Sequence, residues 1–134
     1  MTPYEEGWLS PPGPVARVLV RNRDTGQALA DVQLLIDSGA DVTVIPRHVV
    51  DALRIEALPG EGYGLVGFDG NKSTAPVARL ELVFCQRLFR GRFLLIDQQT
   101  GILGRNVLNA LPLVLDGPRL RWGVARPENL GGGP

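Results

Sequence analysis

The sequence predicts an all-β fold, a small closed β-barrel with one or two short helices. Seventeen glycines and eleven prolines are spread along the 134 residues, and such frequent turn residues favour short strands over long helices. The runs Val15 to Val20 and Ala28 to Ile36 are aliphatic and of strand length. A chain of this length buries one core and is too short for two independent lobes, so we expect a single barrel.

We expect the folded domain to cover residues 15–124. Residues 1–14 contain Ser10-Pro11-Pro12-Gly13-Pro14 and are predicted to form an extended lead-in. Residues 125–134 end in three glycines and a proline, which predicts a flexible tail.

The first half of the domain is expected to hold a hairpin, a strand and a helix. Asn22 to Gly26 is a strong turn signal between the two aliphatic runs, so the runs should pair as a hairpin that leads to Asp37. Val42 to Ile45 is predicted to be a strand. Pro46 then stands at a favoured first-turn position and apolar residues follow at helical spacing, which predicts a short helix.

Hairpins are also expected in the second half. Apolar positions flank Gly67 to Asn71, which predicts a hairpin over Gly62 to Leu82 with this segment at its tip. Core strands are expected at Leu80 to Phe84 and Phe93 to Ile96, with a turn at Leu88 to Gly91 between them. The remaining expected elements are an apolar segment at Gly101 to Gly104, a helical turn or two at Arg105 to Ala110, and a hairpin at Leu113 to Trp122 around Asp116-Gly117-Pro118.

Charge and cysteine content argue against several partners. Fourteen basic residues balance fourteen acidic ones, so the net field gives no reason to expect nucleic acid or an anionic membrane. No run approaches the ~18 apolar residues of a membrane span, and the N-terminus lacks the pattern of a signal peptide. Cys85 is the single cysteine, which excludes an internal disulfide and a Cys-rich zinc site. We therefore expect a cytoplasmic protein.

Asp37 is the main candidate for a catalytic residue. It follows three aliphatic residues at the end of an expected buried strand, where a charged carboxylate is costly without partners. Ser38 supplies a hydroxyl and Gly39 permits close backbone approach, so the three residues can form a tight loop with N–H groups around the carboxylate. An isolated Asp-Ser-Gly favours the alternative, a plain corner in which Asp37 only caps the backbone.

Two stretches together resemble the retropepsin family of aspartic peptidases. Leu34 to Ile45 is similar to the family pattern in which two apolar residues precede Asp-Thr/Ser-Gly-Ala, followed by an acidic residue and small aliphatics. Gly101-Ile102-Leu103-Gly104-Arg105-Asn106 resembles the second family signature, an aliphatic pair before Gly-Arg-Asp/Asn on a short helix. The resemblance spans about Val15 to Trp122. It implies a closed barrel of the acid-protease type, a flap hairpin, and an endopeptidase acting on extended polypeptide substrates.

A single motif in the chain implies two copies in the enzyme. This chemistry needs two carboxylates that share a proton, one taking a proton from the attacking water and one hydrogen-bonding the scissile carbonyl oxygen. Asp97 and Asp116 lack the Ser-Gly context, so neither is a credible second acid. We therefore expect a C2 homodimer in which Asp37 meets its symmetry mate, with Leu113 to Trp122 and part of the lead-in at the interface.

The resemblance also implies roles for neighbouring residues. Ser38 would hydrogen-bond across the dimer axis, and Gly39 would let the substrate backbone approach. Arg105 would form an ion pair near Asp41, the alternative being an exposed helix-end cation, and Asn106 would hydrogen-bond the loop of Asp37. The expected substrate-binding residues are Ala40 and Asp41, with Val66, Gly67, Phe68, Asp69 and Gly70 of the flap, and apolar subsites are expected at Val42, Val66, Phe68 and near Leu103. A plain surface hairpin is the alternative to the flap.

Other chemistry has little support. His48 is the only histidine and lacks a Gly-x-Ser-x-Gly partner motif, and Cys85 has no second histidine or cationic cluster to activate it. The acidic residues lack calcium-loop spacing, so no metal and no cofactor is expected. The alternatives to a peptidase are a catalytically inactive retropepsin-fold module that dimerises or binds peptides, and an unrelated β-barrel interaction domain in which both motifs are accidental.

Overall fold

A computed structural model describes residues 1–59, 62–66 and 72–126, without the side chains of residues 62–66 and 72–74. Within these residues the expected class, all-β with two short helices, is confirmed. Neither of these helices has the length and hydropathy needed to cross a bilayer. The elements are β1 (Thr2–Pro3), β2 (Val15–Arg21), β3 (Ala28–Ile36), β4 (Val44–Pro46), α1 (Arg47–Ala52), β5 (Gly62–Val66), β6 (Lys72–Phe84), β7 (Arg87–Ile96), β8 (Gly101–Leu103), α2 (Arg105–Leu108), β9 (Leu113–Asp116) and β10 (Arg121–Val124).

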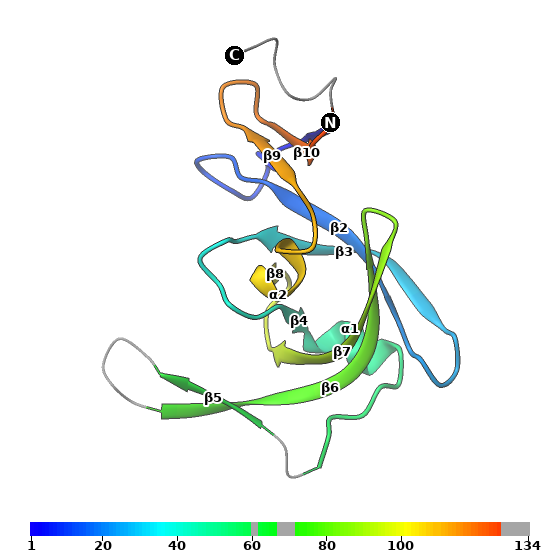
Figure 1. Ribbon diagram of the computed structural model, residues 1–134. Coiled ribbons are helices and arrows are strands. Elements are labelled where there is room, and N and C mark those ends of the chain that lie inside the picture. Colours follow the sequence, from blue (N-terminus) through cyan, green and yellow to red (C-terminus); the bar gives the residue numbers. More distant parts are fainter. Residues whose placement is uncertain (60–61, 67–71, 127–134) are drawn as a thin grey trace.

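Six strands close into a barrel. The hydrogen-bonded order is β2-β3-β8-β4-β7-β6, and β6 returns to β2 through pairs that run from Leu19↔Val83 to Arg21↔Glu81. β5 pairs with β6 and stands outside this ring, so the β5–β6 hairpin projects from the barrel (Figure 1). The expected closed barrel is therefore confirmed.

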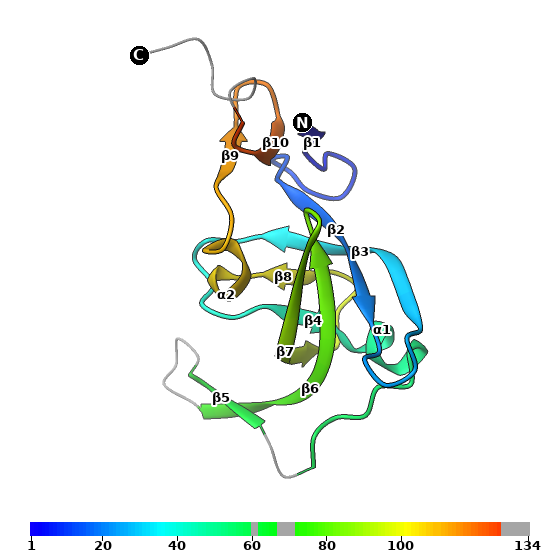
Figure 2. The same cartoon turned by 45° about the vertical axis from the view of Figure 1, so that its right-hand side comes forward.

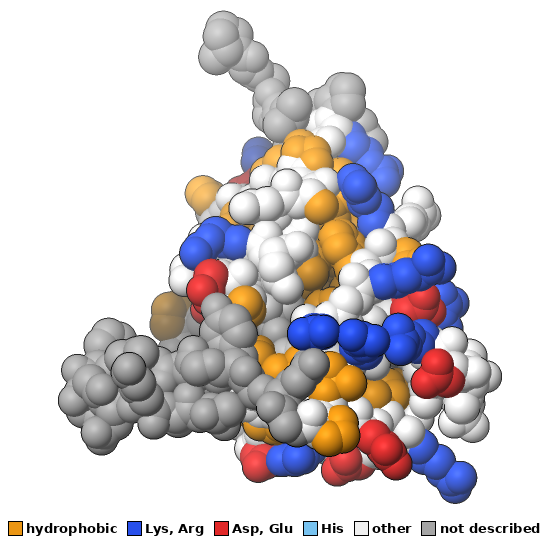
Figure 3. Space-filling view, turned by 60° about the horizontal axis from the view of Figure 1, so that its bottom comes forward, with side chains coloured by type: hydrophobic (Ala, Val, Ile, Leu, Met, Phe, Trp, Pro, Cys, Tyr) orange, Lys and Arg blue, Asp and Glu red, His pale blue; other side chains and the backbone are white. Residues whose placement is uncertain are grey.

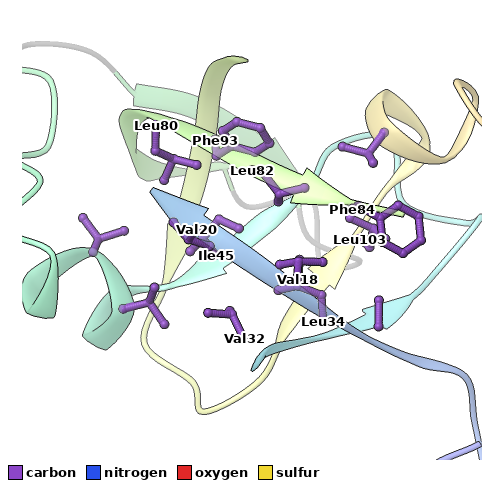
Figure 4. Packing of buried hydrophobic residues seen from close by; sticks show 14 of the residues in the cluster. Val18, Val20, Val32, Leu34, Ile45, Leu80, Leu82, Phe84, Phe93 and Leu103 are labelled. Carbon is purple, nitrogen blue, oxygen red and sulfur yellow. The ribbon is translucent and has the colours of Figure 1, made fainter. Parts of the chain in front are cut away.

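The core fills the inside of the ring. Along β2, Ala16, Val18 and Val20 are buried while Arg17 between them is exposed, which is the two-residue period of a strand with one face on the core. Figure 4 shows side chains from β2, β4, β6 and β8 meeting in the interior. Each fully buried Val or Leu contributes about 1.5–3 kcal/mol relative to exposure, so this cluster holds the barrel closed. The largest fully buried aliphatic side chains are Leu34, Ile45, Leu80, Leu82, Leu103, Val18, Val20, Val49, Val50 and Val107.

β8 brings the two sequence motifs together, the one after β3 that contains Asp37 and the one that begins α2. It runs parallel to β3, with Ile36 opposite Leu103, and antiparallel to β4, with Val44 opposite Ile102. A Cβ on Gly101 would collide with the carbonyl oxygen of Val44, so this strand fits between its neighbours only because it begins with glycine. The end of β3 and the start of α2 are thereby brought side by side.

The chain termini form a second, small sheet. β1 pairs with β10, and β10 pairs with β9, so the expected lead-in contributes a strand to this sheet. Trp122 of β10 is buried and stacks on Phe84 of the barrel, with ring centroids 5.8 Å apart. Such a pair adds about 0.5–1.5 kcal/mol beyond area burial, which ties the terminal sheet to the barrel.

Two expected boundaries are wrong. The turn between the core strands lies at Cys85 and Gln86, whose φ angles are 50° and 65°, whereas Leu88 and Gly91 are paired within the β6–β7 ladder. Two consecutive positive φ values define a tight hairpin turn that favours Asn-Gly, and this chain makes it without either residue. The strand expected from Val42 begins at Val44, and Thr43 just before it bonds the neighbouring segment through its side chain.

Candidate active site

The Asp37 loop starts where β3 ends. The Asp37 N–H donates to the carbonyl of Leu103 at 3.1 Å, which extends the β3–β8 pairing by one residue. The Gly39 N–H donates to Asp37 Oδ1 at 2.9 Å, and the Ala40 N–H donates to the Asp37 carbonyl at 3.1 Å. The carboxylate is thus bonded by one N–H group of its own loop, which fits both the tight loop and the plain corner expected from the triplet. Asp37 is half-buried, whereas Ser38 and Gly39 are exposed at the tip.

Thr43 ties the far end of this loop to α2. Its side chain is fully buried; its hydroxyl donates to Asn106 Oδ1 at 2.7 Å and accepts the Gly104 N–H at 3.0 Å. Asn106 therefore contacts the segment that carries Asp37. Thr43 was not among the expected site residues, although a hydroxyl inside the aliphatic run Val42 to Ile45 is a signal, since a buried hydroxyl needs a partner.

Arg105 braces the middle of the loop. Its N–H donates to the Ala40 carbonyl at 2.8 Å, and its guanidinium Nη1 donates to the Ser38 carbonyl at 2.8 Å. The expected ion pair with Asp41 is wrong, because Asp41 is exposed and no ion pair joins it to Arg105 in the part of the chain that the structure describes. Arg105 bonds the backbone carbonyl oxygens of Ser38 and Ala40 instead.

Gly104 allows α2 to pack this close to the loop. A Cβ at this position would collide with the Val42 carbonyl oxygen and lie 3.0 Å from the Ala40 carbonyl oxygen. Both obstacles are backbone atoms, which cannot rotate away. The second glycine of the Gly-Ile-Leu-Gly segment is therefore required by the contact between α2 and the Asp37 loop.

The expected flap is described only in part. Val66 ends β5, opposite Lys72 of β6, while Gly67, Phe68, Asp69 and Gly70 lie outside the described residues. In Figure 1 and Figure 2 the loop after β3 and the β5–β6 hairpin project toward the same side of the barrel. Leu103 itself is fully buried in the core, so the subsite expected near it stays a prediction about its neighbours.

The remaining candidates lie elsewhere. His48 is exposed, with Nε2 3.4 Å from the Gln99 carbonyl, on a groove of about 570 Å³ whose lining does not include Asp37. Burial raises the pKa of the Cys85 thiol, which disfavours the nucleophilic thiolate at neutral pH. Asp116 is bonded to Arg119 through both the backbone N–H and the guanidinium, and these contacts lower the pKa of its carboxyl. Asp116 therefore caps the β9–β10 turn.

The chain is similar to a solved structure, that of EIAV protease complexed with the inhibitor HBY-793. The TM-score is 0.57 and the identity 23%, and the match covers 73% of this chain and 86% of that one. The similarity shows that this chain has a retropepsin-type fold. No protein-family profile and no curated protein sequence matches the chain.

Proposed function

We propose that this chain is one subunit of a homodimeric aspartic endopeptidase, in which water is activated between two Asp37 carboxylates. The observation that carries the proposal is the Asp37 loop, whose carboxylate is bonded by Gly39 and whose backbone is braced by Arg105 and Thr43. The loop stands on a fold similar to that of an inhibitor-bound protease. A plain corner at the end of a strand does not require these hydrogen bonds between the loop and the start of α2.

The reaction follows from two carboxylates that share one proton. The unprotonated Asp37 of one copy takes a proton from water as the water oxygen bonds to the scissile carbonyl carbon. The protonated Asp37 of the other copy gives its proton to the carbonyl oxygen, which forms a neutral tetrahedral diol. Collapse of the diol then breaks the C–N bond as the amine nitrogen receives a proton from one carboxyl of the dyad and a hydroxyl of the diol returns its proton to the other carboxylate. Two close carboxylates favour the singly protonated state because like charges disfavour a second ionisation.

The second copy would approach the exposed tip of the loop. Ser38 and Gly39 are the exposed residues beside the half-buried Asp37, so a two-fold axis next to them brings the two Asp37 side chains together without unfolding either chain. Ser38 would then hydrogen-bond across the axis. The β5–β6 hairpin, with Val66 to Gly70 at its end, would cover an extended substrate that also contacts Ala40 and Asp41.

The free thiol of Cys85 suits a reducing compartment such as the cytoplasm, where an endopeptidase of this kind would meet unfolded or extended segments of other proteins.

Asp37→Asn tests the proposal, with Asp97→Asn as the matched control. Asp97 is exposed and lies between β7 and β8, so the same chemical change there should leave cleavage of a denatured protein substrate intact. Asp37→Asn should abolish cleavage at mildly acidic to neutral pH. Equal cleavage by Asp37→Asn and the parent would reject the mechanism. No cleavage by a parent chain that is dimeric in solution would favour the inactive peptide-binding module.

A further inference from the structure

β3 has a free edge over residues 28–33, beside the groove of about 570 Å³ that His48 lines. On one side β3 pairs with β2 along its length, from Val15↔Leu35 to Arg21↔Ala28. On the other side it pairs with β8 over residues 34–36. Among the residues that the structure describes, no strand pairs with residues 28–33 on that second side. Figure 2 shows the β2–β3 hairpin extending beyond β8 toward α1.

The lining of the groove follows this edge. Successive side chains of a strand point to opposite faces of the sheet, so a hollow over one face is lined by every second residue. This groove is lined by the consecutive residues 29–33. They include the neighbours Val32, which is buried, and Gln33, which is partly exposed. The groove therefore extends along the edge of β3, in the place that a longer β8 would fill.

A β-bulge places an aspartate on this edge. The β2–β3 register shifts between Val18↔Val32 and Val20↔Leu29, so that Ala30 and Asp31 together stand opposite a single residue of β2. Asp31 has a φ of 58°, in the left-handed region that aspartate and asparagine tolerate better than most residues. Its side chain is exposed, and in the described part of the chain no ion pair joins it to a basic residue.

Two exposed apolar side chains also line the groove. Trp8 is 47% exposed and Leu29 is 38% exposed. The loop that carries Trp8 is closed by a bridge between Glu5 and Gly13, whose backbones exchange hydrogen bonds of 2.7 and 3.1 Å. The tryptophan is thus held beside the edge of β3 by a closed loop. Tryptophan is among the residue types that contribute most to binding at interfaces.

The charge of the lining favours a basic ligand. Lys and Arg side chains gather in a band on the face that Figure 3 shows. None of the described residues that line the groove is a lysine or arginine, and Asp31 is the carboxylate among them. A lysine or arginine can bond this carboxylate, and such a cation is also attracted to the face of an indole ring. A nucleic acid would bring further negative charge to Asp31.

We propose that this groove binds an extended segment of a partner polypeptide, which adds a strand to the free edge of β3 and carries a lysine or arginine beside aliphatic residues. The backbone of the segment pairs with residues 28–33, as in other cases where a peptide extends an exposed sheet edge. Its basic side chain bonds Asp31, and an aliphatic side chain packs on Trp8 and Leu29. Asp37 does not line the groove, so the inference goes beyond the proposed peptidase activity and does not depend on it.

The test is a binding measurement on the full chain carrying Asp37→Asn, so that the probe cannot be cut. The probe is a synthetic peptide in which lysine and valine alternate. One control peptide has glutamate in place of lysine, and a second has every backbone amide N-methylated, so that it cannot donate to a strand edge. Calorimetry gives the affinity. Tryptophan emission locates the peptide, because Trp8 is exposed whereas Trp122, the other tryptophan, is buried.

Two variants remove the proposed contacts, each with a matched control. Asp31→Asn removes the charge and keeps a residue that tolerates the same φ, and Asp24→Asn makes the same change on the exposed turn of the hairpin, outside the groove. Trp8→Ala removes the indole, and Leu88→Ala truncates an exposed apolar residue that does not line the groove. All four side chains are exposed, so none of the changes removes core packing.

The lysine peptide should bind and shift the tryptophan emission to shorter wavelength. Its affinity should fall about two- to fivefold in Asp31→Asn, the range of an exposed ion pair, and at least about tenfold in Trp8→Ala. The two control variants should change it by less than about twofold, and neither control peptide should bind.

Four results would overturn the proposal: no binding of the lysine peptide at low salt, binding of the N-methylated or glutamate peptide as tight as that of the lysine peptide, binding that leaves the tryptophan emission unchanged, or equal weakening in the control variants. An emission shift that follows protein concentration without peptide would place a second copy of the chain at this edge, and the proposed partner would be wrong.

Discussion

Replacing Thr43 by valine removes one hydroxyl from the support of the Asp37 loop and leaves the side-chain shape almost unchanged. Thr43 is fully buried, and its hydroxyl joins two groups from the start of α2, the Gly104 N–H and the Asn106 side-chain oxygen. Valine packs into the same space and can bond neither group. The perturbation therefore isolates the hydrogen bonds from the packing.

The expected loss of folding stability comes from the two groups that lose a hydrogen-bond partner when the Thr43 hydroxyl is removed. The Gly104 N–H is buried, and an unsatisfied buried donor costs about 1–3 kcal/mol. Asn106 is exposed and can turn to water, so its bond accounts for about 0.5–1.5 kcal/mol. Thr43→Val should therefore lower the free energy of unfolding by about 1.5–4.5 kcal/mol. Thr43→Ser keeps the hydroxyl and loses one methyl group, which costs about 1 kcal/mol.

Urea unfolding of the three proteins measures these differences, and amide hydrogen exchange of Gly104 provides a local readout. The Gly104 amide should exchange faster in Thr43→Val than in Thr43→Ser, and peptide cleavage should fall with it because the loop of Asp37 loses its tie to α2. A Thr43→Val protein as stable as the parent, with unchanged Gly104 exchange, would refute the proposed support.

Two further perturbations test the packing of α2 against the Asp37 loop and the hydrogen bonds that Glu81 accepts from Arg21 and Arg90. Gly104→Ala should destabilise the folded protein by about 3 kcal/mol or more, since the added Cβ meets rigid backbone of Val42. Gly117→Ala is the control, because a Cβ there meets nothing within 4 Å and should be tolerated. Thermal unfolding of the two variants measures the difference. The hydrogen bonds from Arg21 and then Arg90 lower the pKa of Glu81 below its usual 4.5, so the stability that the carboxylate contributes is present above about pH 4.5 and is lost as the pH falls through the lowered pKa. Unfolding of the parent and Glu81→Gln across this range should show a stability difference that shrinks on acidification, and a difference independent of pH would contradict the assignment.

Local patterns predicted most of the strands because the physical signals are local. Alternating burial along β2, the Asn22 turn and the proline before α1 each depend on residues within a few positions of one another. The Asp37 motif and the Gly104 motif were also visible, and β8 explains why they belong together.

The errors came from contacts between distant segments. Nothing near Thr2 and Pro3 predicts that they pair with Trp122 and Arg121, so the sequence predicted an extended lead-in but not the pairing that it makes. The hydrogen-bond partner of Arg105 depends on how the loop folds against α2. Its guanidinium bonds the backbone carbonyl of Ser38, whereas the resemblance implied an ion pair near Asp41.

Subunit mixing tests the shared dyad most directly. The parent and Asp37→Asn chains are unfolded together, refolded as an equal mixture at fixed total concentration, and assayed for peptide cleavage. A site that needs Asp37 from both copies leaves only dimers of two parent chains active, so about one quarter of the activity should remain. Retention of about half the parent activity would mean that each chain works alone, and the paired carboxylates would have to be abandoned.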